Sequence, residues 1–285
     1  MADTPDLELQ PAERTPASPP PPRSPRLWIA IAALVVGALA AFYFAVGRRT
    51  APAAVPEPES AAAAPTETRP LGGDRTAVEV PPLDQSDAVV RTLVAQLSSH
   101  PQVAAWLATD GLVRNFTVVV ANVGDGRTPA THLRRLRPTA PFQTITRGNA
   151  TFIDPRSYDR YNGVAGAAAS IDPAGAANLY ATLKPRIEEA YRDLGHPDTP
   201  FDAALERAIV ALLSTPVPDG DVQVEPLAKG IGYRFADPDL EALSESQKLL
   251  LRMGPVNARA VQASLRRIAL ALGISGDRLP QPSHQ

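Results

Sequence analysis

The sequence predicts a mainly α protein: a single-pass transmembrane helix, followed by an extracytoplasmic helical domain with two short β-hairpins, so that β structure is the minor part. Three observations support this prediction. Residues 27–47 (LWIAIAALVVGALAAFYFAVG) form one uncharged apolar run. From Pro81 onward, apolar residues recur at the three- and four-residue spacing of amphipathic helices. Two later stretches have the composition of short paired strands.

The apolar run has the length of a membrane-spanning helix. At a rise of 1.5 Å per residue it extends about 31 Å, and the hydrocarbon core of a bilayer is roughly 30 Å thick. The apolar segment of a cleaved signal peptide has only about 7–15 residues and follows a short basic segment. Here a tail of 26 residues precedes the run, and Arg48 and Arg49 follow it directly. We therefore expect an uncleaved signal anchor.

The orientation of the anchor follows from two considerations. Arg14, Arg23 and Arg26 precede the run, while Arg48 and Arg49 follow it. The end of a span with more positive charge usually lies in the cytoplasm, and three arginines against two favour the N-terminal end by a small margin. In addition, an N-terminal anchor followed by a long domain usually exports that domain. We expect the N-terminus in the cytoplasm, the helix in the inner (cytoplasmic) membrane, and the C-terminal domain in the periplasm.

Composition divides the chain into five segments. Residues 1–26 contain eight prolines and are expected to be a disordered tail. Residues 27–47 are the predicted transmembrane helix, 48–80 a Pro/Ala-rich linker, 81–273 the globular domain, and 274–285 a disordered tail. Residues 81–285 carry 21 basic (Lys, Arg) and 21 acidic residues. A neutral domain gives no reason to expect nucleic acid as a partner.

Helices are predicted from the apolar spacing and from their start signals. One begins at Asp84, a short one follows His100-Pro101, and residues 112–123 keep helical spacing although Val118 to Val120 alone resemble a strand. Further helices are expected from Pro155, Pro173 and Phe201, and Pro185 is expected to kink or break the second of them. Near the C-terminus, Ser244 and Gln247 form a capping box, and Gly254-Pro255 ends one helix and starts the next.

Two β-hairpins are predicted. Residues 142–154 alternate around Gly148-Asn149, a glycine turn. Residues 222–225 and 231–235 form the second pair. The segment from Tyr233 to Leu240 either lines a groove between this hairpin and a helix or places its aromatic rings in the core.

No catalytic or metal-binding motif is present. The chain has no cysteine, which excludes thiol chemistry and disulfides. Asp154, Asp172 and Asp237 each precede a proline, as a helix N-cap does. Glu188 and Arg192 have the spacing of a helix-surface ion pair, and His100 is expected at a helix C-terminus.

The histidines are too scattered in the sequence to predict a metal site, and the phosphate-binding glycine motifs are absent. His100, His132 and His196 lie in distant segments and show no ligand spacing. We therefore expect no metal, no cofactor and no catalytic residue. A serine hydrolase site assembled from dispersed residues stays open as an alternative, because such triads converge only in the folded protein.

One cluster of basic residues suggests a binding site. Arg127, His132, Arg134, Arg135 and Arg137 lie within eleven residues, between a predicted helix and the first hairpin. Arginine binds carboxylates and phosphates through two parallel hydrogen bonds, so this loop is a candidate site for an anionic partner. The alternative is a solvated loop whose arginines pair with acidic residues elsewhere in the domain.

Four segments carry a resemblance to a known family: LVRNFTVVVANVGDGRTPATHLRRLRP, TFIDPRSYDRYN, LYATLKPRIEEAYRDLG and YRFADPDLEALSESQKLLLRMGPVNARAVQASLR. With them the chain resembles the bacterial family of domain of unknown function 3014. The resemblance covers residues 81–273 and extends to the anchor and linker in front. It implies a bacterial, membrane-anchored protein, and it implies no activity and no functional residue.

Together these observations predict a non-enzymatic envelope protein whose domain binds a protein or cell-wall partner. The first alternative is an envelope hydrolase. The second is a transmembrane signalling factor, which requires that the short proline-rich tail bind something in the cytoplasm.

Overall fold

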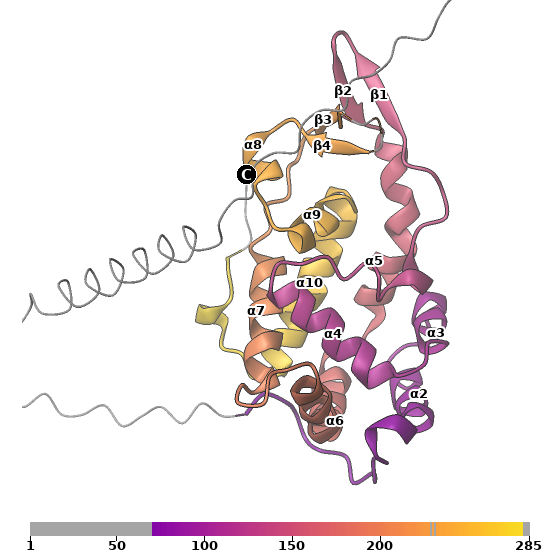
Figure 1. Cartoon of the computed structure of the whole chain (residues 1–285), viewed down its shortest axis with the longest axis vertical. Coiled ribbons are helices and arrows are strands. Elements are labelled where there is room, and N and C mark those ends of the chain that lie inside the picture. Colours follow the sequence, from indigo (N-terminus) through magenta and orange to yellow (C-terminus); the bar gives the residue numbers. More distant parts are fainter. Residues whose placement is uncertain (1–69, 229, 231, 282–285) are drawn as a thin grey trace, which may run out of the picture. The chain divides into compact units, whose positions relative to one another are not determined.

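The computed structural model of the chain describes residues 70–228, 230 and 232–281 (Figure 1). The predicted tail and transmembrane helix, and the linker up to residue 69, lie outside the described residues. Within the described part of the chain, no single helix is long and apolar enough to cross a membrane. Helices α3 (Pro101–Leu107) and α4 (Leu112–Gly124) meet the length and composition requirement only as a pair, bent by 108°.

The domain is mainly helical, as predicted, and its largest core lies among four helices. These are α4, α6 (Pro173–Asp193), α7 (Phe201–Leu213) and α10 (Pro255–Ala271). Helix α4 packs against α6 and α7, and α10 packs against α6, α7 and α5 (Asn162–Ser170). Helix α2 (Asp87–Ala95) packs on α4, beside α3 (Figure 1). Leu112, Tyr191 and Phe201 are almost completely buried in this core.

Helix α4 confirms the prediction for residues 112–123. Val118 to Val120 are part of the helix, because the apolar positions of the whole segment fit helical spacing better than strand alternation. The predicted caps at Asp154, Asp172 and Asp237 are also confirmed. Each carboxylate accepts a hydrogen bond from a backbone N–H in the following turn, as in Gly175 N–H to Asp172 Oδ2 (2.6 Å).

Two predicted helix starts are wrong in detail. Asp84 lies in a 3₁₀ turn, η1 (Leu83–Gln85), and α2 begins at Asp87. Here Ser86 is buried and its hydroxyl donates to the Leu83 carbonyl at 2.8 Å, which closes the short turn before the helix. Pro155 likewise begins a 3₁₀ helix, η3 (Pro155–Tyr161), which continues directly into α5.

One further expectation is corrected, and of the expected kink or break at Pro185 the break is absent. His100 is the N-cap of α3, not a C-terminal residue of the preceding helix, because its Nδ1 accepts a hydrogen bond from Gln102 N–H at 3.2 Å. Helix α6 runs through Pro185 without a break. Buried residues of α6 lie on both sides of this proline, among them Leu183 and Ile187, and packing of this kind outweighs the loss of one backbone hydrogen bond.

The two predicted hairpins are present and join into one four-stranded antiparallel sheet. Strands β1 (Thr144–Arg147) and β2 (Ala150–Ile153) flank Gly148, whose φ of 60° fits the first central position of a two-residue hairpin turn. Strands β3 (Gln223–Pro226) and β4 (Tyr233–Phe235) form the second hairpin. Pairing of Thr151 with Val224 connects the hairpins, in the order β1-β2-β3-β4.

The sheet lies at one end of the helical body (Figure 1). It forms a second, smaller core with α8 (Pro238–Glu241) and α9 (Glu245–Leu251), built on Ile153, Val224, Phe235, Leu240 and Leu251. Ser244 and Gln247 form the predicted capping box of α9, and Gly254 separates α9 from α10 as expected.

The two ends of the described chain both contact the main core. Leu71, in a stretch that the sequence assigned to the linker, is buried there. Ile274 and Leu279, on either side of the 3₁₀ turn η4 (Gly276–Arg278), are buried in the same core. The described residues that pack as one domain therefore extend from Leu71 to Leu279.

Candidate functional site

The arginine loop connects α4 to β1 and contains the 3₁₀ turn η2 (Arg134–Leu136). Arg127 forms an ion pair with Asp125, at 2.5 Å between Nη2 and Oδ2. Arg134, Arg135 and Arg137 are exposed, and none of them pairs with a carboxylate within the described part of the chain. In this loop, three arginine side chains have no carboxylate partner among the described residues, and the fourth, Arg127, pairs with Asp125.

His132 helps to fix this loop to the helices rather than to present another cation. Its side chain is half-buried, and its backbone carbonyl accepts a hydrogen bond from Asn115 Nδ2 at 3.1 Å. The Asn115 side chain also accepts from the indole N–H of Trp106, at 3.4 Å. The predicted site residues therefore lie in one loop. Arg127 has a carboxylate partner, His132 is bonded to α4 through its backbone, and the other three arginines pair with no described carboxylate.

A second feature is a cavity of about 370 Å³ inside the helical body, which we call the apolar cavity. Its wall is built by α2, α3, α4, α6, α7 and α10, with Leu97, Ile171 and Leu272 from the connecting segments. Every lining residue is aliphatic or aromatic, and none is charged. The volume falls within the range of about 300–1,000 Å³ that is usual for small-molecule sites.

The one hydroxyl in this wall belongs to Tyr180 and is already engaged. It donates to Asp202 Oδ1 at 2.5 Å, while Asp202 Oδ2 pairs with Lys184 Nζ at 2.5 Å. Burial, together with the hydrogen bond to Asp202, raises the pKa of the Tyr180 hydroxyl far above its ordinary value, so the group stays protonated. The cavity therefore offers apolar contact and no free polar group.

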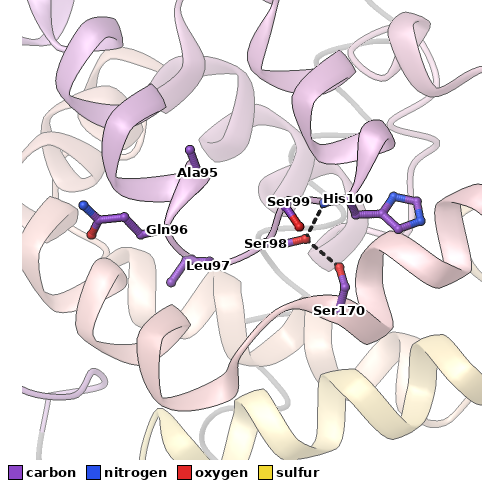
Figure 2. Close-up of a pocket in the computed structure, with 7 residues that line it drawn as sticks. All are labelled: Ala95, Gln96, Leu97, Ser98, Ser99, His100 and Ser170. Carbon is purple, nitrogen blue, oxygen red and sulfur yellow. Dashed lines mark hydrogen bonds between the residues drawn. The ribbon is translucent and has the colours of Figure 1, made fainter.

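A shallow depression of about 500 Å³ shares one lining residue, Leu97, with the apolar cavity. Its other lining residues are Ala95, Gln96, Ser98, Ser99, His100 and Ser170 (Figure 2); we call it the serine depression. Ser98 Oγ and Ser170 Oγ are 2.7 Å apart, and His100 N–H donates to Ser98 Oγ at 3.0 Å. Ser170 directly precedes Ile171, which lines the cavity.

The serine depression does not have the geometry of a hydrolase triad. A triad requires an imidazole hydrogen-bonded to the nucleophilic hydroxyl and a carboxylate on its other nitrogen. The imidazole of His100 points away from the hydroxyls of Ser98 and Ser170 (Figure 2), and its Nδ1 is occupied by Gln102 N–H. Across the residues described here, no hydrogen bond joins a serine hydroxyl to a histidine ring.

The segment from Tyr233 to Leu240 combines both expected roles. Phe235 and Leu240 are buried in the smaller core. Tyr233 is 37 % exposed and packs on Phe142, with ring centroids 5.4 Å apart. Both rings line a depression of about 350 Å³ beside β4, where the Arg160 guanidinium lies 5.3 Å from the Phe142 ring centroid.

The remaining polar candidates have structural partners. Glu188 does not pair with Arg192; both of its carboxylate oxygens accept from Phe201 N–H at 3.1 Å, at the start of α7. The backbone N–H of Phe201 has no partner within its own helix, so the carboxylate turns toward it. Among residues 70–281, apart from 229 and 231, no three His, Asp or Glu side chains gather as a metal site requires.

Comparison with known proteins identifies the family. Residues 112–269, more than half of the 285-residue chain, match the family described as Protein of unknown function (DUF3014). The chain belongs to this family. No curated protein and no solved structure matches it. The DUF3014 region runs from the first residue of α4 into the last turn of α10, so it contains the arginine loop, the sheet and most of the wall of the apolar cavity.

The apolar cavity was not predicted from the sequence. Most of its lining residues lie on the apolar faces of separate helices, and most of them belong to the main core. The apolar positions of α4, including the adjacent pairs Leu112-Val113 and Val119-Val120, fit one ordinary amphipathic stripe and give no sign of a cavity. Whether facing side chains meet or leave a space depends on how far apart the helices pack, and apolar spacing does not specify this distance.

Proposed function

We propose that this protein is a membrane-anchored, non-enzymatic binding protein whose helical domain holds an alkyl chain in the apolar cavity. The anchor is the predicted helix at residues 27–47, with the N-terminus in the cytoplasm and the domain outside the inner membrane. The partner is thus an apolar molecule that reaches the domain in the cell envelope. No catalytic residue or cofactor takes part.

The apolar cavity is the observation that carries this proposal. At about 24 cal/mol per Å³, an empty cavity of 370 Å³ costs on the order of 9 kcal/mol. This is comparable with the whole stability of a typical domain, about 5–15 kcal/mol. Water is a poor occupant, because an apolar wall gives it no hydrogen-bond partners. An apolar ligand restores the missing contacts and removes this cost.

The predicted anchor supports the choice of an alkyl chain. A bilayer is the largest store of alkyl chains in a cell, and the linker keeps the domain within on the order of 100 Å of it. The serine depression beside the cavity supports a non-enzymatic role, since Ser98 and His100 stabilise the start of α3 rather than face each other as nucleophile and base.

Trp106 provides a direct test, because it lines the cavity and the chain has only one other tryptophan, Trp28. The full chain carrying Trp28→Phe is placed in lipid nanodiscs and titrated with 1-bromodecane, whose bromine quenches indole fluorescence at contact. We expect saturable quenching of Trp106, reversed by an excess of decane.

Two variants with the same substitution make this test specific. Val119→Phe fills part of the cavity. We expect half-maximal quenching of this variant to require a bromodecane concentration at least about ten times higher. Val256→Phe, at a position 77 % exposed and outside the cavity wall, is expected to leave it unchanged. Quenching that never saturates, or that is the same in both variants, would show that the cavity does not bind an alkyl chain.

The exposed arginines favour a second candidate function, the docking of an anionic protein or cell-wall partner on the arginine loop. Arg134, Arg135 and Arg137 are the relevant observation, because no described carboxylate pairs with them. The test is co-sedimentation of the full chain with isolated cell-wall sacculi at low and moderate salt. We expect binding that weakens with salt and that is lost in Arg134→Glu/Arg135→Glu.

A matched control separates this site from a general effect of charge. Arg75→Glu/Arg267→Glu makes the same charge change at two other exposed arginines that pair with no described carboxylate. Equal loss of binding in both double variants would contradict a role specific to the arginine loop. Binding that the loop variant leaves intact would eliminate the loop as the docking site.

A further inference from the structure

We infer that the ligand of the apolar cavity is a single-chain amphiphile with a neutral, hydroxyl-bearing head, and that the head binds at the serine depression. This inference rests on the function proposed above and specifies its ligand. It follows from the wall residue that the two hollows share, from the hydrogen bonds of the serine hydroxyls, and from the absence of charged residues in the lining of the depression.

The cavity and the depression share one wall residue. Leu97 lines both, and Ser98 and Ser170 are the chain neighbours of the cavity-lining residues Leu97 and Ile171. We place the end of the bound chain at Leu97, so that its head reaches the serine hydroxyls. At roughly 30 Å³ per water-sized group, 370 Å³ holds a chain of on the order of ten carbons.

The hydrogen bonds of the two serines determine what the head must offer. Ser170 Oγ donates its only hydrogen to the Ala167 carbonyl at 2.7 Å. Ser98 Oγ must then donate in the 2.7 Å contact between the two hydroxyls, and it also accepts from His100 N–H. Each oxygen has two lone pairs, so one remains free on each while no hydrogen does. The pair accepts hydrogen bonds from a ligand and cannot donate to it.

This pattern selects a hydroxyl among common lipid heads. A carboxylate or an ester has no hydrogen to donate to Ser98 or Ser170. A hydroxyl donates to them and can also accept from Ser99, whose side chain has no partner within the described part of the chain. No lysine, arginine, aspartate or glutamate lines the depression, so a charged head would gain no counter-ion there.

The test extends the Trp106 quenching experiment in the full chain carrying Trp28→Phe. Bound 1-bromodecane is displaced by decane, 1-decanol or decanoate, compared at equal mole fractions in the nanodisc lipid. We expect 1-decanol to restore Trp106 fluorescence at a concentration at least about threefold lower than decane or decanoate. A gain in affinity of this size corresponds to one or two additional hydrogen bonds.

Ser98→Ala/Ser170→Ala then removes both acceptors. We expect this variant to bind 1-bromodecane as before and to lose its preference for 1-decanol, and Ser170→Ala alone provides a milder form of the same change. Equal displacement by the three compounds, a preference for decanoate, or a decanol preference that survives in the double variant would each overturn the head assignment. If 1-bromodecane does not quench Trp106 at all, the proposed function itself fails, so the two failures are distinguishable.

Discussion

Asp154 contacts two groups at the start of η3. Its Oδ1 accepts the backbone N–H of Arg156 at 2.9 Å, and its Oδ2 pairs with Arg156 Nη2 at 2.7 Å. The Arg156 side chain, and then its backbone N–H, hold the pKa of the Asp154 carboxyl below its usual range. Among the described residues, Asp154 is the one carboxylate that is buried. Ionised Asp154 therefore favours the folded state.

The sign of this effect gives a pH-dependent prediction. Because the folded pKa of Asp154 lies below the unfolded value of about 4, its stabilisation is fully present above that value and is lost as pH falls through the folded pKa. Asp154→Asn keeps an N-cap side chain and removes the charge. We expect the variant to be less stable than the parent in urea unfolding at pH 7, and the difference to shrink at pH 3. A difference independent of pH would show that the charge is not responsible.

At the scale of elements, the junction of α9 and α10 depends on one glycine. Gly254 has φ 79° and ψ 166°, a region that is essentially restricted to glycine. A Cβ at this position would also overlap the ring of Tyr158. This turn directs α10 back along the helical body, where it packs on α5, α6 and α7. The backbone of the turn and the packing of the longest C-terminal helix are thus linked.

This junction gives a prediction with a matched control. Gly254→Ala is expected to lower the free energy of unfolding by more than about 3 kcal/mol, since the backbone strain of about 1–3 kcal/mol adds to the overlap with Tyr158. Gly195→Ala, where φ is 96° and no atom lies within 4 Å of the added Cβ, is expected to cost only the strain. Chemical denaturation of the two variants measures both. Equal losses would mean that the contact with Tyr158 relaxes freely.

At the scale of the whole molecule, residues 70–76 form a strap across α6. Leu71 N–H donates to Asp202 Oδ2 at 3.1 Å, Gly73 N–H to the Ala177 carbonyl at 3.0 Å, and Thr76 N–H to Thr182 Oγ1 at 3.0 Å. The same Asp202 holds Tyr180 in the wall of the apolar cavity. The segment where the predicted linker enters the domain is therefore connected to the candidate binding site.

The strap is expected to contribute measurably to stability. Leu71 is 7 % exposed, so Leu71→Ala in the full chain should lower the free energy of unfolding by about 2–5 kcal/mol. Leu270→Ala, at a position 52 % exposed on α10, should change it by less than about 0.5 kcal/mol. Urea unfolding followed by circular dichroism measures both. An equal, small effect would mean that the strap is held by its hydrogen bonds alone.

The candidate site was only partly predictable from the sequence. The arginine loop was identified by its composition, but its division into paired Arg127 and exposed Arg134, Arg135 and Arg137 was not, because the partner of an arginine depends on which carboxylates fold beside it. The prediction of an ion pair between Glu188 and Arg192 was wrong for the same reason. Glu188 bonds to Phe201 N–H across a turn between two helices, and the i, i+4 rule describes only neighbours within one helix.

The sequence by itself determined the local structure of the described residues: the mainly helical class, most helix positions, the three Asp caps, the capping box and both hairpins. These depend on the side-chain pattern and on contacts within a few residues. Only the tertiary structure decided that the hairpins join into one sheet, that the strap and residues 274–279 pack with the core, and that six helices line an apolar cavity. These features depend on distances between segments far apart in the chain, and the local pattern of apolar and polar residues does not fix those distances.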